Sequence, residues 1–251
     1  MNKIDIDYII KTVELASTEI MKIYNHFNVI EYKYKNDSTP LTIADKLSND
    51  MIINRLLKFN IPILSEESKF IPYEERKNWQ YYWLLDPLDG TKEFINKNGE
   101  FTINLALMFI NKPIWGIVSA PFFNKTYYIN SKNQVILKDN GKSRVLKPKS
   151  KFIDNELTAV VSRSHLDTKT KLKLQKNNIT KIILSGSSLK FMMIVERKAN
   201  IYYRLAPTME WDTAASHAIL KNLNYNIYKE DENSEIEYNK KNLLNPNFIS
   251  F

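Results

Sequence analysis

The chain has 251 residues, of which 43% are hydrophobic and 12% aromatic, so it can bury a large core in one domain or in two smaller ones. It contains no cysteine and three histidines, which excludes disulfides, thiolate zinc sites, iron–sulfur clusters, cysteine nucleophiles and a cluster of imidazole metal ligands. The net charge of +8 indicates an anionic partner, but its sign does not choose among nucleic acid, a membrane surface and a small polyanion.

No apolar run in the sequence approaches the roughly 20 residues that a membrane-spanning helix needs. Residues 1–7 carry acidic side chains within their apolar pattern, where a signal peptide would have a purely apolar stretch. We therefore expect a cytoplasmic protein without a transmembrane segment.

The first half of the chain predicts two helices followed by strands. Apolar residues at spacings of three and four predict an amphipathic helix over 4–27. A second helix is expected over 43–59, because Thr42 with Asp45 three positions later forms a capping-box pattern. Short apolar strands follow, and then antiparallel strands joined by turns; we expect them over 61–64, 81–85, 101–109, 114–120, 126–129 and 134–137.

A basic stretch, residues 138–151, lies between the two halves of the chain. It has no aromatic residues for base stacking, so we interpret it as a solvated connection and do not expect nucleic acid as a partner. Beyond it the pattern alternates between strands (157–161, 182–184, 199–204, 225–228) and helices (167–176, 187–196, 212–223). The change predicts an α+β half over 1–150 and an α/β half over 151–251, with a loop over 230–242.

The segment Asp86-Pro-Leu-Asp-Gly-Thr91 follows an apolar, aromatic run and is the most informative in the chain. Proline lacks a donor and glycine favours turns, so we expect the strand to end at Asp86 and a turn to hold Asp86 and Asp89 close together. Two such carboxylates repel each other, and a hard divalent cation relieves that repulsion best. Free N–H groups at Gly90 and Thr91 suit a phosphate. The plain alternative is an ordinary turn.

Three acidic sites fall at the ends of predicted elements, namely Glu66 with Glu67, Asp86 with Asp89, and Asp212, and each has a structural alternative. Glu66 and Glu67 follow the first short strand, and they would also suit a solvated loop. Asp212 stands where a strand, a turn and a helix meet, and it would also suit a helix cap. Asp45 has its own alternative as the acid of the capping box.

Taken together, three ordered segments resemble the signatures of the magnesium-dependent, lithium-sensitive phosphatases of the inositol monophosphatase superfamily. These segments are Ser65-Glu-Glu67, Asp86-Pro-Leu-Asp-Gly-Thr91 and Trp211-Asp-Thr-Ala-Ala215. Further segments are similar to the bacterial 3′(2′),5′-bisphosphate nucleotidases of this superfamily, namely Asp89–Ile95, Asn98–Asn104, Val161–His165 and Gly186–Phe191. The resemblance covers essentially the whole chain. It implies a layered αβαβα sugar-phosphatase fold with the active site between the two halves.

The resemblance also implies a metal site with two or more Mg²⁺ ions. One ion would be held by Glu66, Asp86 and the carbonyl of Leu88, and a second by Asp86, Asp89 and Asp212. Thr91, oriented by Asp45, would act with Glu66 to activate the attacking water. All-oxygen ligation of this kind suits magnesium.

The same resemblance implies a set of substrate contacts. They are Glu66, Asp89, Gly90, Thr91, Lys92, Ser162, His165, Ser187, Lys190 and Asp212. His165 would equally suit a polar surface loop, and Ser187 a helix cap. Arg163 and Arg204 are further cationic candidates for a substrate with two phosphates.

The activity implied is hydrolysis of the 3′-phosphate of adenosine 3′,5′-bisphosphate, which would remove a by-product of sulfate activation. An inositol monophosphatase or a sugar bisphosphatase is the nearest alternative, although inositol-type members usually have Thr and Asn where this chain has Lys92 and Glu93. A non-catalytic nucleotide-binding or nucleic-acid-binding protein is a second alternative, but it would have lost a metal ligand. Glu210 is acidic beside a polyanion site, which leaves the substrate preference open. A peripheral association with the inner membrane, and a monomer or a homodimer, are left open.

Overall fold

The computed structural model describes residues 4–26, 31–35, 40–149, 157–163 and 168–251. Two helices, α1 (Ile6–His26) and α2 (Ile43–Leu56), begin the fold, and the 3₁₀ turn η1 (Leu57–Phe59) extends α2. Thr42 accepts hydrogen bonds from the backbone of Ala44 and Asp45, while Asp45 accepts one from the backbone of Thr42 at 2.7 Å. The predicted capping box is therefore confirmed. The short strands β1 (Tyr32–Tyr34) and β2 (Pro40–Thr42) pair beside these helices.

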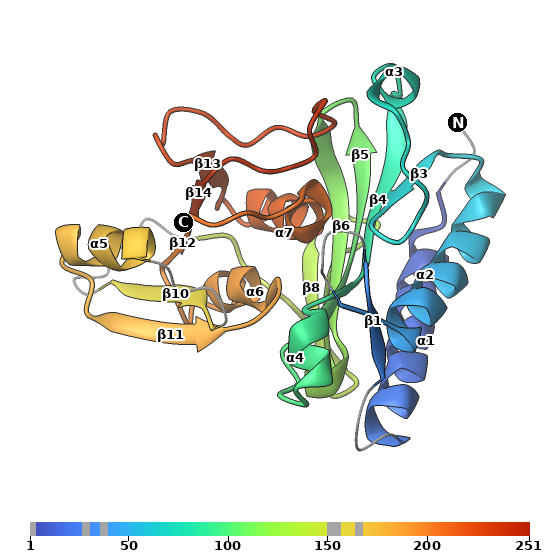
Figure 1. Ribbon diagram of the computed structural model, residues 1–251, viewed down its shortest axis with the longest axis horizontal. Helices are drawn as coiled ribbons and strands as arrows, with labels where there is room; N and C mark the ends of the chain where they lie inside the picture. Colours follow the sequence, from blue (N-terminus) through green and yellow to red (C-terminus); the bar gives the residue numbers. More distant parts are fainter. Residues whose placement is uncertain (1–3, 27–30, 36–39, 150–156, 164–167) are drawn as a thin grey trace.

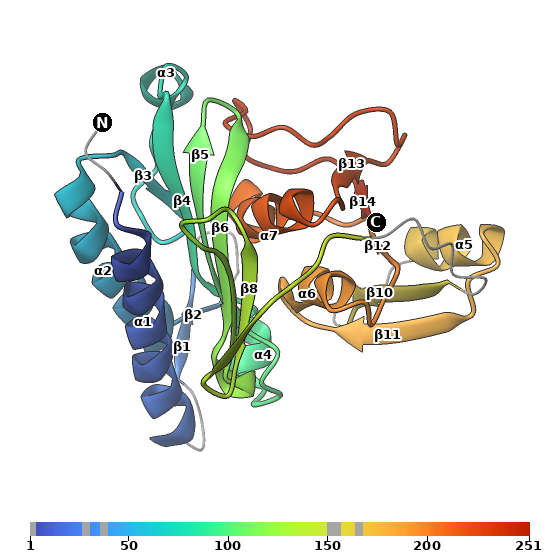
Figure 2. The ribbon, with the colours of Figure 1, turned by 180° about the vertical axis from the view of Figure 1, so that it is seen from behind.

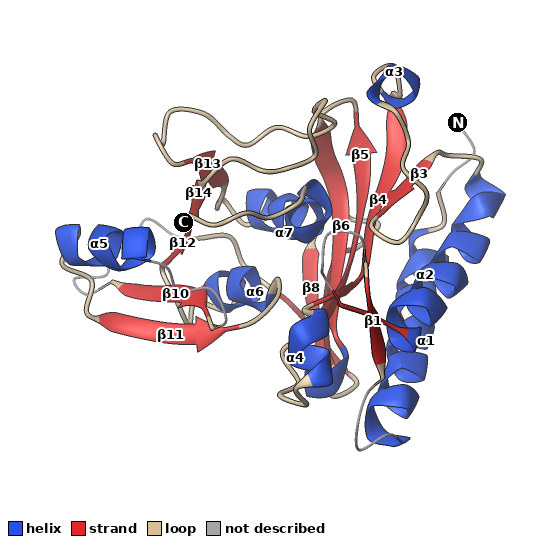
Figure 3. Cartoon of the chain, viewed as in Figure 1, coloured by secondary structure: helices blue, strands red, loops and turns tan. Residues whose placement is uncertain are grey.

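A seven-stranded sheet forms the centre of the molecule, in the order β3-β4-β5-β6-β7-β8-β9 (Figure 3). Only β3 and β4 are parallel to each other, and the other neighbours are antiparallel, as the sequence predicts for this region. Its strands are β3 (Ile63–Ser65), β4 (Tyr81–Asp89), β5 (Thr102–Phe109), β6 (Lys112–Ala120), β7 (Lys125–Ile129), β8 (Val135–Asp139) and β9 (Lys142–Val145). The connections contain the short helices α3 (Tyr73–Arg76) and α4 (Thr91–Ile95) and the 3₁₀ turn η2 (Pro121–Phe123).

Two predictions about these strands were wrong. Strand β4 does not end at Asp86 but continues to Asp89, because the chain absorbs Pro87 and Leu88 in a register shift and then pairs again with β5. The stretch over 138–151 is not only a connection, because Lys142–Val145 forms the exposed edge strand β9. Charged residues are common on edge strands, where they discourage pairing with another chain. Because β9 is charged, it has no apolar pattern from which a strand could be predicted.

A second, five-stranded sheet has the order β11-β10-β12-β14-β13. Its elements in chain order are β10 (Thr158–Ser162), α5 (Thr168–Lys176), β11 (Lys181–Ser185), α6 (Leu189–Val195), β12 (Ile201–Arg204), α7 (Glu210–Asn222), β13 (Ile227–Lys229) and β14 (Phe248–Ser250). Strands β10, β11 and β12 are parallel, whereas β14 is antiparallel to both of its neighbours. The predicted alternation of strands and helices is confirmed here.

The elements stack in layers (Figures 1 and 2). Helices α1 and α2 cover one side of the large sheet, α6 and α7 lie between the two sheets, and α5 lies beyond the small sheet. Helix α7 packs closely on β6, since a Cβ added at Gly116 would lie 2.3 Å from the carbonyl oxygen of Ala215. One apolar core therefore joins residues of both halves, and the boundary near residue 150 stays a prediction. No helix of the described ranges is long and apolar enough to span a membrane.

Candidate active site

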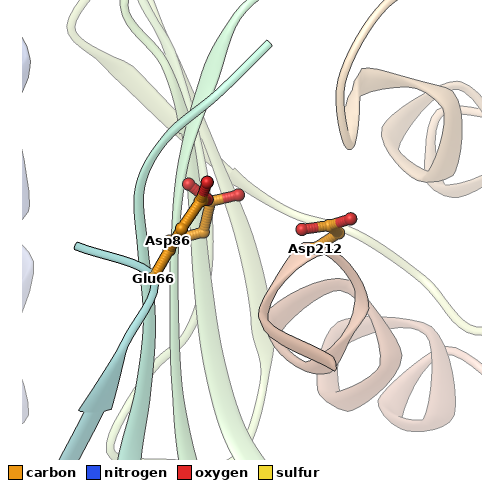
Figure 4. Close-up of side chains that lie close together, drawn as sticks. All are labelled: Glu66, Asp86 and Asp212. Atoms are coloured by element: carbon orange, nitrogen blue, oxygen red, sulfur yellow. The ribbon is translucent and has the colours of Figure 1, made fainter. Parts of the chain in front are cut away.

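Three carboxylates from different elements meet between the large sheet and α7. Glu66 follows β3, Asp86 lies in β4, and Asp212 lies in the first turn of α7. One oxygen of each lies within 4.8 Å of the others. Figure 4 shows Glu66 and Asp86 side by side on the sheet, with Asp212 facing them from the helix. The structure thus brings together three of the predicted metal ligands.

The electrostatics of this cluster favour a bound cation. Burial, reinforced by Glu66, Asp89 and Asp212, raises the pKa of Asp86 well above its ordinary value. Burial and the charges of Asp89 and Glu66 do the same to the pKa of Asp212. Burial raises the pKa of Asp89 to about 6, although the charge of Lys190 opposes this shift. Oxygen ligands under mutual repulsion suit a hard divalent ion, so the residues present fit the metal site that the sequence predicts.

The register shift in β4 places Asp86 and Asp89 on the same side of the sheet. Asp86 pairs with Asn104 and Asp89 with Thr102, so three steps along β4 match two along β5. In a regular strand, residues three apart point to opposite faces, and one extra residue reverses this. Both aspartates accordingly line the same pocket.

Asp45 caps α2 and also accepts a hydrogen bond from Thr91, so its place in the capping box does not exclude the predicted contact with Thr91. The Thr91 hydroxyl lies 3.1 Å from Asp45 Oδ1 and 3.3 Å from the carbonyl oxygen of Leu88. Asp45 Oδ2 meanwhile accepts the bond from the Thr42 backbone. Burial raises the pKa of Asp45, although its hydrogen bonds with Thr42 and Thr91 oppose the shift. Asp45 is 1% exposed and does not line the pocket, and its hydrogen bond with Thr91 connects it to a residue that does.

Gly90 occupies a place where a side chain would not fit. Its φ is +91°, and a Cβ there would lie 2.9 Å from the carbonyl oxygen of Glu100 and 3.2 Å from Ser187 Cβ. The backbone of Gly90 leads directly into α4, which begins at Thr91. The glycine thus lets the segment before α4 lie against the residues before α6 from the other half of the chain.

A single pocket of about 480 Å³ joins the carboxylate cluster to the small-sheet side of the molecule. Eleven of the predicted site residues line it: Glu66, Asp86, Leu88, Asp89, Gly90, Thr91, Lys92, Ser162, Ser187, Lys190 and Asp212. Arg204 lines it as well, with its Nη2 donating to the carbonyl oxygen of Pro207 at 2.9 Å. His165 lies outside the described residues.

Lys190 is a buried cation beside the anionic cluster. It is 5% exposed, and its ammonium group donates to the carbonyl oxygens of Ser187 at 2.5 Å and Ser185 at 3.4 Å. Burial lowers the pKa of Lys190 to about 8, while the negative charge of Asp89 opposes this shift. The pocket is therefore lined by both carboxylates and cationic side chains.

Two charged residues near the pocket, Glu210 and Arg163, form hydrogen bonds with groups outside the pocket lining. Glu210 is fully buried and accepts hydrogen bonds from the backbone of Asn239 at 2.6 Å and of Lys240 at 3.1 Å. Because Glu210 does not line the pocket, we do not regard its charge as evidence against an anionic substrate. Arg163 forms two 2.7 Å hydrogen bonds with the carboxylate of Glu100, which tie the two halves together outside the pocket lining.

The sequence analysis missed some residues that shape the site. Lys35 lines the pocket and pairs with Glu66 at 2.7 Å and with Glu67 at 2.5 Å. Lys35 is the second of two lysines that alternate with tyrosines over 32–35, and nothing in this pattern indicates a contact with Glu66 or Glu67. Asn104 and Ser188 hold Asp89, and a signal existed for Asn104, which is a polar residue in the largely apolar strand β5.

A model described as the inositol monophosphatase family matches residues 4–248. The chain belongs to this family. Among its relatives, a protein of Buchnera aphidicola named 3′(2′),5′-bisphosphate nucleotidase CysQ is 41% identical over 220 residues, covering 86% of this chain and 80% of the relative. A protein of the same name from Salmonella typhimurium is 38% identical, covering 93% of this chain and 94% of the relative.

Solved structures of the family confirm the predicted fold. The crystal structure of CysQ from Bacteroides thetaiotaomicron, a bacterial member of the inositol monophosphatase family, matches with a TM-score of 0.82 and 35% identity, covering 97% of this chain and 95% of that one. An inositol monophosphatase of Thermotoga maritima matches with a TM-score of 0.76 at 21% identity, covering 98% and 91%. The layered αβαβα arrangement is therefore that of the family.

Proposed function

We propose that this protein is a metal-dependent phosphatase that hydrolyses the 3′-phosphate of adenosine 3′,5′-bisphosphate to AMP and inorganic phosphate. The names of the relatives above support this substrate. The observation that carries the proposal is the juxtaposition of the carboxylate cluster with Lys190 and Arg204 in one pocket. A substrate with two phosphates would bring one to the carboxylates through a metal ion and the other to the cations.

The metal would be Mg²⁺, and two ions would be held. Glu66, Asp86 and the carbonyl of Leu88 would bind one, and Asp86, Asp89 and Asp212 the other. A pair of such ions would offset the charge of the phosphate and activate water for an in-line attack. Every ligand in this set is an oxygen, which favours magnesium over softer metals.

The protein's own groups would then position the attacking water. Thr91 donates its hydroxyl proton toward Asp45, so the lone pairs of its oxygen are left to accept a hydrogen bond from water. Glu66 would accept a proton from the same water as a general base. Asp45 would act by fixing the rotamer of Thr91.

The remaining pocket residues would bind the nucleotide. The backbone N–H groups of Gly90 and Thr91 would hold the phosphate that is cleaved, because they stand at the start of α4, whose first N–H groups have no acceptor within the helix. Lys190 and Arg204 would hold the second phosphate. Lys92, Ser162 and Ser187 line the same pocket and complete the proposed contacts, with His165 as a further predicted one.

We also infer a cytoplasmic location, because the proposed substrate is formed inside the cell. The peripheral membrane association and the choice between monomer and homodimer stay predictions.

The test is phosphate release from adenosine 3′,5′-bisphosphate and from inositol 1-phosphate, each with Mg²⁺ and with EDTA. We expect metal-dependent release with a preference for the nucleotide. A preference for inositol phosphate would retain the mechanism and overturn the substrate. Absence of release from both would overturn the proposed activity.

A further inference from the structure

The carboxylate of Asp89 is held on one side by buried polar groups from both halves of the chain. Its Oδ2 accepts a hydrogen bond from the backbone N–H of Ser188 at 2.6 Å and one from the side-chain amide of Asn104 at 3.3 Å. Thr102 approaches the same oxygen at 3.5 Å, the limit of a hydrogen bond. Asn104 and Thr102 belong to β5, whereas Ser188 immediately precedes α6. All three are at most 1% exposed.

The hydrogen bonds among these groups have a fixed direction. The Ser188 hydroxyl donates to Asn104 Oδ1 at 2.7 Å. Since a hydroxyl has one proton, Ser188 must accept in its 2.8 Å contact with Thr102, which is then the donor. Asn104 therefore turns its carbonyl toward Ser188 and its NH₂ toward Asp89. The opposite orientation would place an amide oxygen against a carboxylate oxygen, which is unfavourable.

The two carboxylate oxygens of Asp89 have different surroundings, because Oδ2 accepts hydrogen bonds from the described residues and Oδ1 accepts none from them. The hydrogen bonds from Ser188 and Asn104 both involve Oδ2, and the longer approach of Thr102, whose proton points to Ser188, is to the same oxygen. Oδ1 is left as a ligand atom on a residue that lines the pocket beside Asp86 and Asp212. A carboxylate with one oxygen fixed cannot rotate freely about its last torsion, so less conformational entropy is lost when the other oxygen binds a cation.

We propose that Asn104 and Ser188 are positioning residues that orient Asp89 for the divalent cation. This inference rests on the proposed metal-dependent reaction, but it concerns metal binding and not the identity of the substrate. Because Ser188 comes from the second half, the ligand is complete only when α6 is docked against β5. Residues that orient metal ligands in this way commonly change affinity 10–100-fold when they are lost.

The experiment measures Mg²⁺ binding to the substrate-free protein by isothermal titration calorimetry. We compare wild type with Asn104→Ala and Ser188→Ala. Ser119→Ala is the matched control. Ser119 lies on the neighbouring strand β6 and is also a buried serine, 2% exposed. Its hydroxyl contacts Ser17 at 2.9 Å and Thr126 at 3.3 Å. Its loss removes similar hydrogen bonds from the same sheet without touching Asp89.

We expect the Mg²⁺ dissociation constant to rise about 10–100-fold in Asn104→Ala and several-fold in Ser188→Ala, with no change in Ser119→Ala. Unchanged affinity in Ser188→Ala would overturn the inference, and so would an equal loss in Ser188→Ala and Ser119→Ala. If Asn104→Ala fails to fold, Ser188→Ala decides alone, since it keeps the backbone N–H bond to Asp89 and removes only a hydroxyl.

Phosphate release measured on the same samples separates this inference from the proposed function. Weaker Mg²⁺ binding in the variants, with no hydrolysis of adenosine 3′,5′-bisphosphate by wild type, would support the positioning role and reject the substrate. Normal hydrolysis by wild type, with unaltered Mg²⁺ affinity in both variants, would support the substrate and reject the positioning role.

Discussion

His217 is buried in α7, and we predict that it makes the stability of the protein depend on pH. It is 1% exposed, with Nε2 2.6 Å from Asn226 Oδ1 and Nδ1 3.0 Å from the hydroxyl of Tyr238. The amide of Asn226 donates to Glu235 at 2.7 Å, so its oxygen faces His217 and accepts the Nε2 proton. In a neutral imidazole with its proton on Nε2, Nδ1 is an acceptor for the hydroxyl of Tyr238, which is shared with Thr213 Oγ1 at 3.2 Å. Burial lowers the pKa of His217 to about 4.

The size of the effect follows from this pKa and the ordinary value of 6.5. Between pH 6.5 and 4 the unfolded chain binds a proton that the folded chain does not, so the free energy of unfolding falls as the pH falls. Each unit of pKa difference corresponds to about 1.4 kcal/mol. His217 should therefore make the free energy of unfolding about 2 kcal/mol lower at pH 5 than at pH 8. This is a large fraction of a typical stability of about 5–15 kcal/mol.

Urea denaturation of wild type and His217→Gln at pH 8 and pH 5 checks this reasoning. Glutamine keeps a polar side chain but does not titrate, and the other ionisable groups are common to both proteins. The stability advantage of wild type over the variant should shrink by about 2 kcal/mol between pH 8 and pH 5. An advantage that stays constant across this range would refute the neutral, buried histidine.

The remaining predictions concern the pocket and the packing of α7. Asp89→Asn should lower kcat at least about 100-fold with unchanged circular dichroism, because it weakens a metal ligand; activity within a few-fold of wild type would reject that assignment. Lys190→Ala should raise KM for adenosine 3′,5′-bisphosphate about tenfold but barely alter KM for 3′-AMP, because only the former has a second phosphate; equal changes would remove its proposed role. Mg²⁺ at about 100 times its Kd should raise the melting temperature by about 5–10 °C over an EDTA sample, and no rise would contradict a cation site at the carboxylates. Gly116→Ala should lower the free energy of unfolding by about 1–3 kcal/mol in urea, because its Cβ would meet the carbonyl of Ala215; wild-type stability would show that α7 can shift at low cost.

Much of the fold could be predicted because its signals are local. The periodicity of α1 and the capping box at Thr42 each depend on residues a few positions apart, and both are confirmed. The continuation of β4 past Pro87 could not be predicted in this way, because pairing with β5 decides it. Strand β9 was missed for a similar reason, since its partner β8 gives it a structure that its own charged residues do not favour.

In the site, too, features carried by local sequence motifs could be predicted, whereas features set by distant residues could not. Glu66, Asp86 and Asp212 stand in three ordered motifs that resemble the family's signatures, so the resemblance implied their meeting. The direction of Glu210 could not, because it depends on backbone groups of Asn239 and Lys240 almost thirty residues away. The hold of Ser188 on Asp89 likewise exists only once the two halves have docked.

The close packing of α7 on β6 bears on how this protein can diversify. Asp212 comes late in the chain, yet the helix that carries it rests on the large sheet, as do Glu66 and Asp86. Ser162 and Arg204 instead stand on strands of the small sheet. Under the proposed function, mutations in the small sheet would change which molecules bind in the pocket while Glu66, Asp86 and Asp212 stay in place, so that new specificities could arise without rebuilding the chemistry.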